Sequence, residues 1–154
     1  MKAEGMIDGY YDDPIETAAK FRNDWFYPGD LGSLTKDGQL VVHGRADDMM
    51  ILNGINIYPS EVERAFDAHP NVAASAAFPV KSRIHGEIPV VALELKLGSQ
   101  ITEAELLAYA REKLGMRGPR KIMLLDKLPR NALGKVLKTE LADKLNRTNE
   151  RNKT

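Results

Sequence analysis

Residues 44–63 have the sequence GRADDMMILNGINIYPSEVE. The stretch opens with a polar, turn-prone run, Gly44–Asp48, which is the best candidate for a domain boundary. Two apolar runs follow, and Asn53-Gly54 separates them. Asn-Gly accepts the positive φ angles of a type I′ turn, so this pattern predicts a β-hairpin. Ser60-Glu61-Val62-Glu63 then has the spacing of a capping box and predicts a helix that starts there.

Beyond this stretch, strand and helix patterns alternate over about 100 residues, the size of one compact domain. Apolar runs predict three strands, at residues 72–80, 90–97 and 121–125. Thr102 followed by Glu105 is a second capping box, and Gly115 is the expected end of its helix. A last helix is expected after Gly134.

Before this stretch, residues 1–47 contain a short helix capped by Asp13 and a hairpin around Lys36-Asp37-Gly38. They offer too little apolar sequence for a core of their own. We therefore expect residues 1–47 to be the end of a larger domain, residues 48–145 to be a small domain, and residues 146–154 to be a disordered tail. The expected fold class is α+β, with a short mixed β-sheet flanked by helices, preceded by a helix and a β-hairpin fragment.

The composition is that of a globular protein. Of the 154 residues, 43% are hydrophobic and 29% are charged, and the formal net charge is zero. A zero net charge gives no argument for a nucleic-acid or membrane partner. The absence of cysteine removes disulfides and thiolate zinc sites, and fits a cytoplasmic location. No apolar run approaches the roughly 20 residues of a membrane span, and the first residues lack the apolar core of a signal peptide.

Charge is unevenly distributed between residues 111 and 138. Only Glu112 and Asp126 oppose the basic residues of this segment, which are Arg111, Lys113, Arg117, Arg120, Lys121, Lys127, Arg130, Lys135 and Lys138. For any single residue a solvated face with some salt bridges is the favoured interpretation. A surface that meets a phosphorylated ligand is the alternative.

Two residues stand in loops that could present a charge to a ligand. Lys135 follows Gly134, but a phosphate-binding P-loop would need glycine and Ser or Thr where Pro129 and Val136 stand. Asp30 follows a Pro-Gly turn, where a carboxylate can accept hydrogen bonds from two neighbouring hydroxyls. On these local patterns alone, a solvated loop lysine and a turn aspartate are the commoner cases. The three histidines lack metal-ligand spacing, so no metal site is predicted.

Three segments, taken together, resemble three segments of one known family in the same order and spacing. Residues 25–32, WFYPGDLG, resemble the ribose-binding segment of the adenylate-forming superfamily of acyl-CoA synthetases, peptide-synthetase adenylation domains and luciferases. Residues 44–63 resemble its hinge and the hairpin that follows. Residues 128–138, LPRNALGKVLK, resemble its catalytic-lysine loop. The resemblance covers nearly all of residues 5–145 and identifies the chain as the C-terminal domain of such an enzyme, with the end of its N-terminal domain.

The sequence also departs from the family pattern. Pro28 and Tyr27 stand where the family usually has Thr and a basic residue, and Lys138 stands where it often has Arg. The phosphate loop and the aromatic-Gly-x-Thr-Glu segment belong to the family's large N-terminal domain and are not in this chain.

The resemblance implies that a carboxylic acid, fatty or aryl, attacks the α-phosphate of ATP. Coenzyme A then displaces AMP. In that scheme Lys135 bridges the carboxylate and the α-phosphate, Asp30 holds the ribose hydroxyls, and Arg45 lies near the ribose or phosphate. ATP and Mg²⁺ would be bound mainly by the large domain.

The resemblance also implies a turn of the small domain about Asp47 between the two steps. The hairpin residues Asn53, Gly54 and Ile55 would then line the tunnel for the thiol. The 154-residue chain is expected to be inactive alone and to form homo-oligomers through the exposed edge of residues 1–47. Two alternatives remain open: the lid of a peptide synthetase or carrier-protein ligase, and a non-catalytic nucleotide-binding module.

Overall fold

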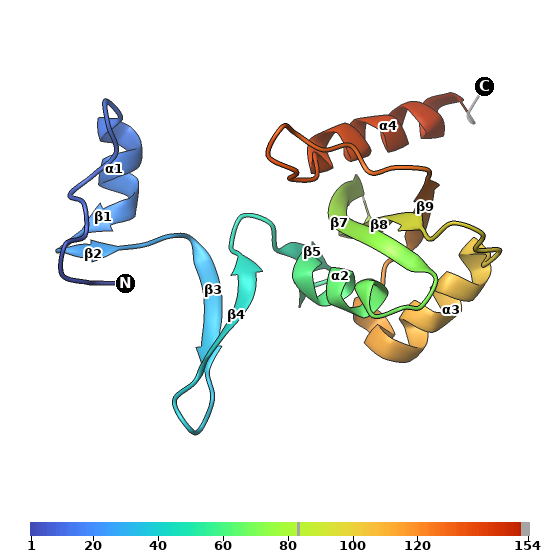
Figure 1. The fold of residues 1–154 in the computed structure, drawn as a ribbon, viewed down its shortest axis with the longest axis horizontal. Coiled ribbons are helices and arrows are strands. Elements are labelled where there is room, and N and C mark those ends of the chain that lie inside the picture. Colours follow the sequence, from blue (N-terminus) through green and yellow to red (C-terminus); the bar gives the residue numbers. More distant parts are fainter. Residues whose placement is uncertain (83, 152–154) are drawn as a thin grey trace. The chain divides into compact units, whose positions relative to one another are not determined.

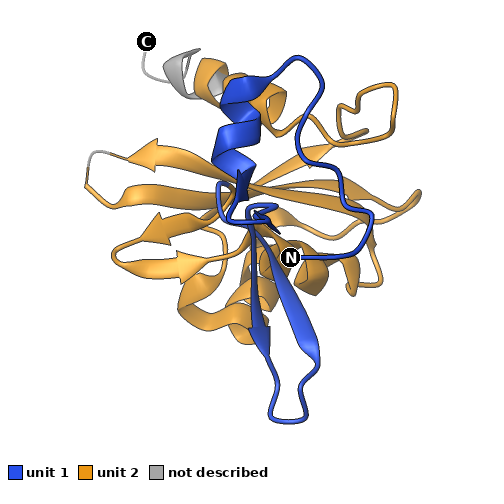
Figure 2. Ribbon diagram, turned by 90° about the vertical axis from the view of Figure 1, so that its left-hand side faces the viewer, with its two compact units in different colours: residues 1–47 blue, residues 48–154 orange. Residues whose placement is uncertain are grey.

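The chain divides into two compact units. The computed structural model describes residues 1–82 and 84–151. Unit 1 is Met1–Asp47 and unit 2 is Asp48–Thr154 (Figure 2). The division falls within the polar run Gly44–Asp48. Within the described residues, every helix is too short or too polar to cross a lipid bilayer.

Unit 2 is built on a five-stranded sheet (Figure 1). β7 (Val72–Ser82) and β8 (Gly86–Leu95) pair antiparallel along their length. The opposite edge of β8 is shared by β5 (Met50–Leu52), antiparallel at its start, and β9 (Lys121–Leu125), parallel further along. β6 (Ile55–Ile57) completes the sheet beside β5. The predicted mixed sheet is therefore confirmed.

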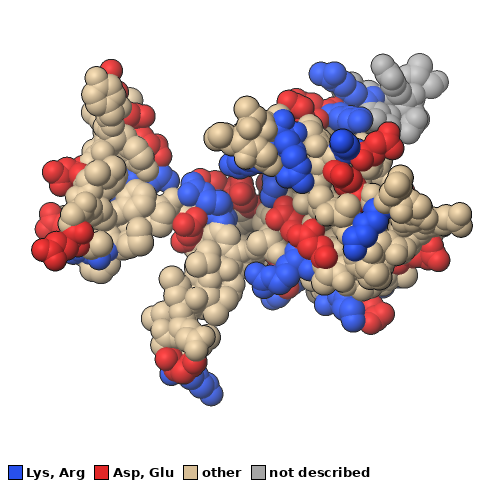
Figure 3. All heavy atoms as spheres, viewed as in Figure 1, with Lys and Arg blue, Asp and Glu red and all other residues tan. Residues whose placement is uncertain are grey.

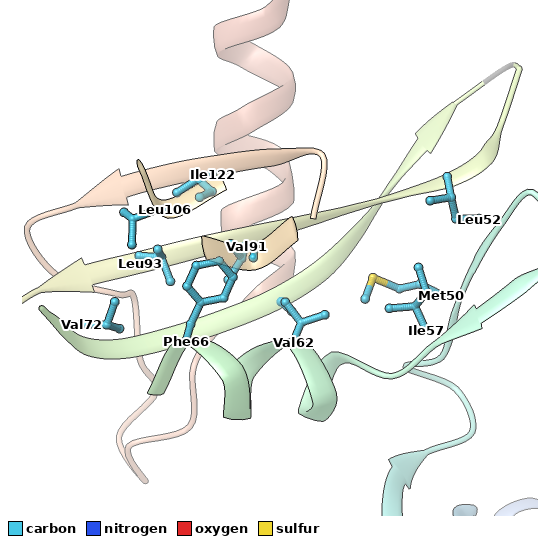
Figure 4. Close-up of a cluster of buried hydrophobic side chains, with 12 residues drawn as sticks. Met50, Leu52, Ile57, Val62, Phe66, Val72, Val91, Leu93, Leu106 and Ile122 are labelled. Carbon is cyan, nitrogen blue, oxygen red and sulfur yellow. The ribbon is translucent and has the colours of Figure 1, made fainter. Parts of the chain in front are cut away.

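Alternating residues of β7 and β8 point into two cores, because successive side chains of a strand face opposite sides of the sheet. Val91 and Leu93 pack with α2 (Pro59–Asp67) and α3 (Glu103–Leu114) on one face (Figure 4). Val90 and Ala92 pack with α4 (Lys138–Arg151) on the other. Both faces are thus covered by helices, which explains why β8 reads as a nearly continuous apolar run rather than an alternating one.

Two helices, α2 and α3, cover the first face of the sheet, and their N-termini are capped differently. α2 spans Pro59–Asp67, and α3 spans Glu103–Leu114, continued by the 3₁₀ turn η1 (Gly115–Arg117). Thr102 and Glu105 form the predicted capping box of α3. The capping box predicted at Ser60–Glu63 is wrong. Tyr58 is the N-cap of α2 and makes no side-chain cap bond, because Pro59 already occupies the first helical position, which it suits.

The helix of the second face, α4, spans Lys138–Arg151. It begins four residues after Gly134. Leu141 and Leu145 are buried and anchor it to the sheet. The tail predicted to be disordered from residue 146 is helical as far as Arg151, because two packed turns nucleate a helix that polar residues then extend. The rest of that prediction, residues 152–154, lies outside the described residues.

Unit 1 consists of a helix and two short two-stranded ladders. α1 spans Pro14–Lys20, β1 (Phe21–Arg22) pairs with β2 (Trp25–Phe26), and β3 (Asp30–Leu34) pairs with β4 (Leu40–Arg45). Asp13 caps α1 as predicted, by accepting a hydrogen bond from the Glu16 amide. None of residues 1–47, all of which the structure describes, is buried. The predicted lack of a core is confirmed.

Candidate functional site

Three of the predicted site residues, Asp30, Arg45 and Asp47, lie together at the open end of the β3–β4 hairpin in unit 1. Asp30 and Arg45 face each other across the two strands. The Arg45 guanidinium lies 3.6 Å from the Asp30 carboxylate and 3.4 Å from that of Asp47. It also donates a 2.6 Å hydrogen bond to the Pro28 carbonyl. Asp30, Arg45 and Asp47 therefore form one exposed charge cluster.

The turn before Asp30 fits closely under this cluster. Gly29 has φ +86°, and a Cβ there would lie 3.4 Å from the Arg45 guanidinium. Its carbonyl accepts a hydrogen bond from the Ala46 amide at 2.8 Å. Pro28, one of the departures from the family pattern, contributes its carbonyl rather than a side chain. A glycine at position 29 lets the two strand ends approach.

The Asn53-Gly54 hairpin has the predicted backbone. Both residues have positive φ, +49° and +80°, as a type I′ turn requires. The hairpin is held beside the turn that joins β7 and β8. Asn53 Oδ1 lies 3.2 Å from His85 Nδ1, and the Ile51 amide donates to the Glu87 carboxylate at 3.0 Å. His85 and Glu87 thus position this hairpin.

Asn131 organises the loop that carries Lys135 between β9 and α4. Its Oδ1 accepts hydrogen bonds from the backbone amides of Leu133 (3.0 Å) and Lys135 (2.9 Å). Its own amide donates to the Lys135 carbonyl, and its carbonyl accepts from the Gly134 amide, both at 2.9 Å. The Arg130 guanidinium closes the loop on the Gly134 carbonyl at 2.8 Å. Sequence reasoning missed Asn131, although Asn before a glycine turn is a known signal for this bonding.

Lys135 stands exposed on this closed loop. Among the side chains that the structure describes, those of residues 1–82 and 84–147, its Nζ has no hydrogen-bond or ion-pair partner. The lysine borders a hollow of about 510 Å³ on unit 2. Its lining residues come from the segment before β5, α2, β7, the loop and the start of α4: Asp48, Glu63, Ser75, Ala76, Asn131, Lys135, Val136, Leu137, Lys138 and Thr139. A rigid loop therefore presents a free ammonium at the rim of an open cavity.

A second lysine of the hollow is paired. Lys138 Nζ lies 2.8 Å from the Glu63 carboxylate, and both side chains are half-buried. The same carboxylate accepts a hydrogen bond from the Ala77 amide of β7 at 2.9 Å. The predicted thiol-tunnel residues Asn53, Gly54 and Ile55 are not among the described residues that line this hollow.

On the face of unit 2 shown in Figure 3, positive and negative side chains are interspersed. Arg117 pairs with Glu61 at 3.1 Å and Lys113 with Glu112 at 3.3 Å. The structure favours the solvated face with salt bridges.

The sequence of the chain is similar to those of known enzymes. Residues 61–135 match the family described as the AMP-binding enzyme C-terminal domain. The chain is 39% identical over 142 residues to the 2-succinylbenzoate–CoA ligase of Geobacillus kaustophilus, covering 92% of this chain and 29% of the relative.

Two solved structures share the fold. The o-succinylbenzoate CoA synthetase of Bacillus subtilis, bound to its acyl-adenylate intermediate, matches with a TM-score of 0.84 and 35% identity over 91% of this chain and 29% of its own. ATP-bound MatB of Rhodopseudomonas palustris matches with a TM-score of 0.78 and 36% identity over 88% of this chain and 27% of its own. The chain thus spans less than a third of the relatives it matches. Residues 61–135 correspond to the AMP-binding enzyme C-terminal domain, and the structural neighbours of the chain are adenylate-forming enzymes.

Proposed function

We propose that this chain is the C-terminal part of an AMP-forming acid–thiol ligase, an acyl-CoA synthetase, and that it supplies the catalytic lysine. The observation that carries the proposal is the free ammonium of Lys135 on a hydrogen-bonded loop at the rim of a cavity. The names of the relatives, which are CoA ligases and synthetases, support the same reaction class.

Lys135 would act in the first half-reaction. A carboxylate oxygen of the acid bonds to the α-phosphorus of ATP, and the bond from that phosphorus to the bridging oxygen of pyrophosphate breaks. Negative charge on the phosphate oxygens is neutralised by a positioned cation, which stabilises the transition state. Lysine suits this role as a compact donor on a flexible stem. The acid would be fatty or aryl, and Mg²⁺ would be bound mainly outside this chain.

Unit 1 would hold the nucleotide. The Asp30 carboxylate is exposed and can accept hydrogen bonds from both ribose hydroxyls, and Arg45 beside it can meet the ribose or a phosphate. Asp47 ends unit 1, where a short polar segment can absorb the backbone rotation of a hinge. In the second half-reaction the thiol of coenzyme A attacks the acyl carbon and releases AMP, with Asn53, Gly54 and Ile55 along its path.

The proposal is tested in a chimera. Residues 1–154 replace the matching segment of the Bacillus subtilis o-succinylbenzoate CoA synthetase, and ATP–pyrophosphate exchange with o-succinylbenzoate reports adenylation. We expect exchange in the chimera, and a loss of about 2.7–4 kcal/mol of transition-state stabilisation, roughly 100- to 1,000-fold in rate, for Lys135→Ala. Lys127→Ala, an exposed lysine of the same segment, serves as the control and should retain the rate.

A folded chimera without exchange, or an unchanged rate in Lys135→Ala, would contradict the proposal. Exchange by the 154-residue chain alone would contradict its role as a part of a larger enzyme. Thioester formation with coenzyme A, compared with a carrier protein, distinguishes the acyl-CoA synthetase from a carrier-protein ligase or peptide synthetase. The cytoplasmic location stays a prediction.

A further inference from the structure

Charges of both signs line the hollow beside Lys135. Asp48 and Glu63 contribute carboxylates, and Lys135 and Lys138 contribute ammonium groups. An ammonium that must bind substrate oxygens is useful only if no carboxylate of the protein binds it first. The arrangement of these four groups therefore bears on the availability of Lys135.

Among the carboxylates of the ion pairs recorded in the described residues, Glu63 has the least exposed side chain. Its side chain is 24% exposed, and that of Lys138 is 32% exposed. The carboxylate is fixed on two sides, by Lys138 at 2.8 Å and by the Ala77 amide at 2.9 Å. The Ser75 hydroxyl also donates to the Glu63 carbonyl at 3.2 Å, so the helix is tied to the edge of β7 here. The Glu63 carboxylate cannot turn away from the hollow without breaking its contacts with Lys138 and the Ala77 amide.

Removing one partner of a half-buried ion pair leaves an uncompensated charge, which is unfavourable in proportion to its desolvation. Without Lys138, the Glu63 carboxylate would face a hollow in which Lys135 is the other recorded cation. A lysine on a four-carbon stem can swing to such a carboxylate. The Glu63–Lys138 ion pair thus affects whether Lys135, which is not part of it, keeps a free ammonium.

We propose that Lys138 is a positioning residue that occupies the Glu63 carboxylate and so keeps the Lys135 ammonium free for the substrate. The proposal deepens the function proposed above, because it assumes that Lys135 acts in adenylation. It differs from a purely structural clip between α2 and α4. In a clip, loss of either partner is equally harmful, whereas here removing the Glu63 charge should rescue the loss of Lys138.

The availability of Lys135 is measured in the 154-residue chain. Acetylation by an N-hydroxysuccinimide ester near pH 8 is followed at Lys135 by mass spectrometry of its peptide, with Lys127 as the internal reference. An ion-paired ammonium gives up its proton less readily and reacts more slowly. We expect Lys138→Met to slow labelling of Lys135 about two- to fivefold, the scale of a solvent-accessible ion pair. Lys138→Arg should label at the original rate, and Glu63→Gln/Lys138→Met should return to it.

Catalysis gives the second readout, in the chimera described above. Lys138→Met should lower adenylation and leave thioester formation from preformed acyl-adenylate unchanged, because Lys135 is assigned to the first step only. Glu63→Gln/Lys138→Met should recover adenylation. Circular dichroism confirms that each variant folds.

The outcomes separate the two proposals. Equal labelling of Lys135 in Lys138→Met and Lys138→Arg would overturn the inference, whatever the chimera does. A double variant as impaired as Lys138→Met would also overturn it and leave a structural clip. An unaffected Lys135→Ala chimera would instead remove the proposed function, while the labelling result would still test the ion pair.

Discussion

At the scale of single residues, Asn131 and Arg45 each hold several groups together. The Asn131 side chain satisfies two backbone amides of the lysine loop, and the Arg45 guanidinium contacts Asp30, Asp47 and the Pro28 carbonyl. Buried or not, an amide that loses its acceptor in a tight loop must be rehydrated, which loosens the loop. Asn131, which the sequence analysis did not single out, sets the geometry of the lysine loop, and Arg45, which it did, sets that of the cluster around Asp30.

Asn131→Ala should therefore unlock the loop without unfolding unit 2. We expect faster hydrogen exchange at the Lys135 and Leu133 amides, because their shared acceptor is removed. Asn131→Asp keeps an acceptor at the same place and should retain the protection. Two-dimensional NMR of the 154-residue chain measures both. Unchanged exchange in Asn131→Ala would show that the remaining backbone bonds suffice.

At the scale of helices and strands, local patterns were reliable where the partner is near in sequence. Asp13 and Thr102 cap their helices as predicted, because the bonds that define these caps join residues three positions apart. Glu63 has the same spacing from Ser60, but its carboxylate goes to Lys138 and to the edge of β7. A contact across 75 positions of sequence has no local signature, so this part of the site could not be predicted. The same holds for the extension of α4 beyond Leu145, because it depends on the packing of Leu141 and Leu145 against the distant sheet.

The capping box of α3 gives a prediction about pH. Glu105 accepts hydrogen bonds from the backbone amide and the hydroxyl of Thr102, and these lower the pKa of its carboxyl from the ordinary 4.5. A lowered folded-state pKa means that the stabilisation is full above the unfolded pKa and is lost as pH falls through the folded value. Glu105→Gln should thus lower the melting temperature near pH 7.

The difference in melting temperature between Glu105→Gln and the original chain should close as the pH falls below 4.5. Glu103→Gln is the control, because Glu103 lies in the same first turn but outside the capping box. Melting temperatures are measured by circular dichroism. If the difference near pH 7 equals the difference below pH 4.5, the ionisation of Glu105 does not contribute to the stability of α3.

The β5–β6 hairpin gives a prediction about the second half-reaction. A Cβ added at Gly54 would have no heavy atom of the described residues within 4 Å, its two chain neighbours apart, so it would project into open space. In the chimera, Gly54→Leu should slow thioester formation more than adenylation. Any L-residue is strained at φ +80°, at a cost of about 1–2 kcal/mol. Gly98→Leu, at φ +81° in another turn of unit 2, is the matched control for that strain. Equal slowing of both half-reactions would remove the hairpin from the thiol path.

At the scale of the whole chain, the two units differ in kind. Unit 2 has two cores, one on each face of its sheet, whereas unit 1 has no buried residue. Its β3–β4 hairpin leaves apolar side chains in solvent, with Leu34 72% and Leu40 68% exposed. The lack of a core in unit 1 could be predicted from the sequence, because a short helix and a hairpin offer too little structure to enclose the apolar side chains.

We therefore expect the isolated 154-residue chain to self-associate through unit 1, since exposed apolar strands at an open edge favour pairing. Light scattering should give a concentration-dependent mass above the monomer, and Leu34→Ser/Leu40→Ser should reduce it. Ile84→Ser, an equally exposed apolar residue of unit 2, is the control. A monomer at all concentrations would rule out this surface.

The neighbours of β8 come from widely separated parts of the chain, and this has a consequence for synthesis. The β7–β8 pair leaves the ribosome before α3 and β9 exist, so the edge of β8 from Val90 to Glu94 stays open until residue 125 has emerged. An exposed, apolar strand edge can pair with a strand of another polypeptide chain. The nascent chain is therefore most exposed to misassembly while residues 96–125 are being translated.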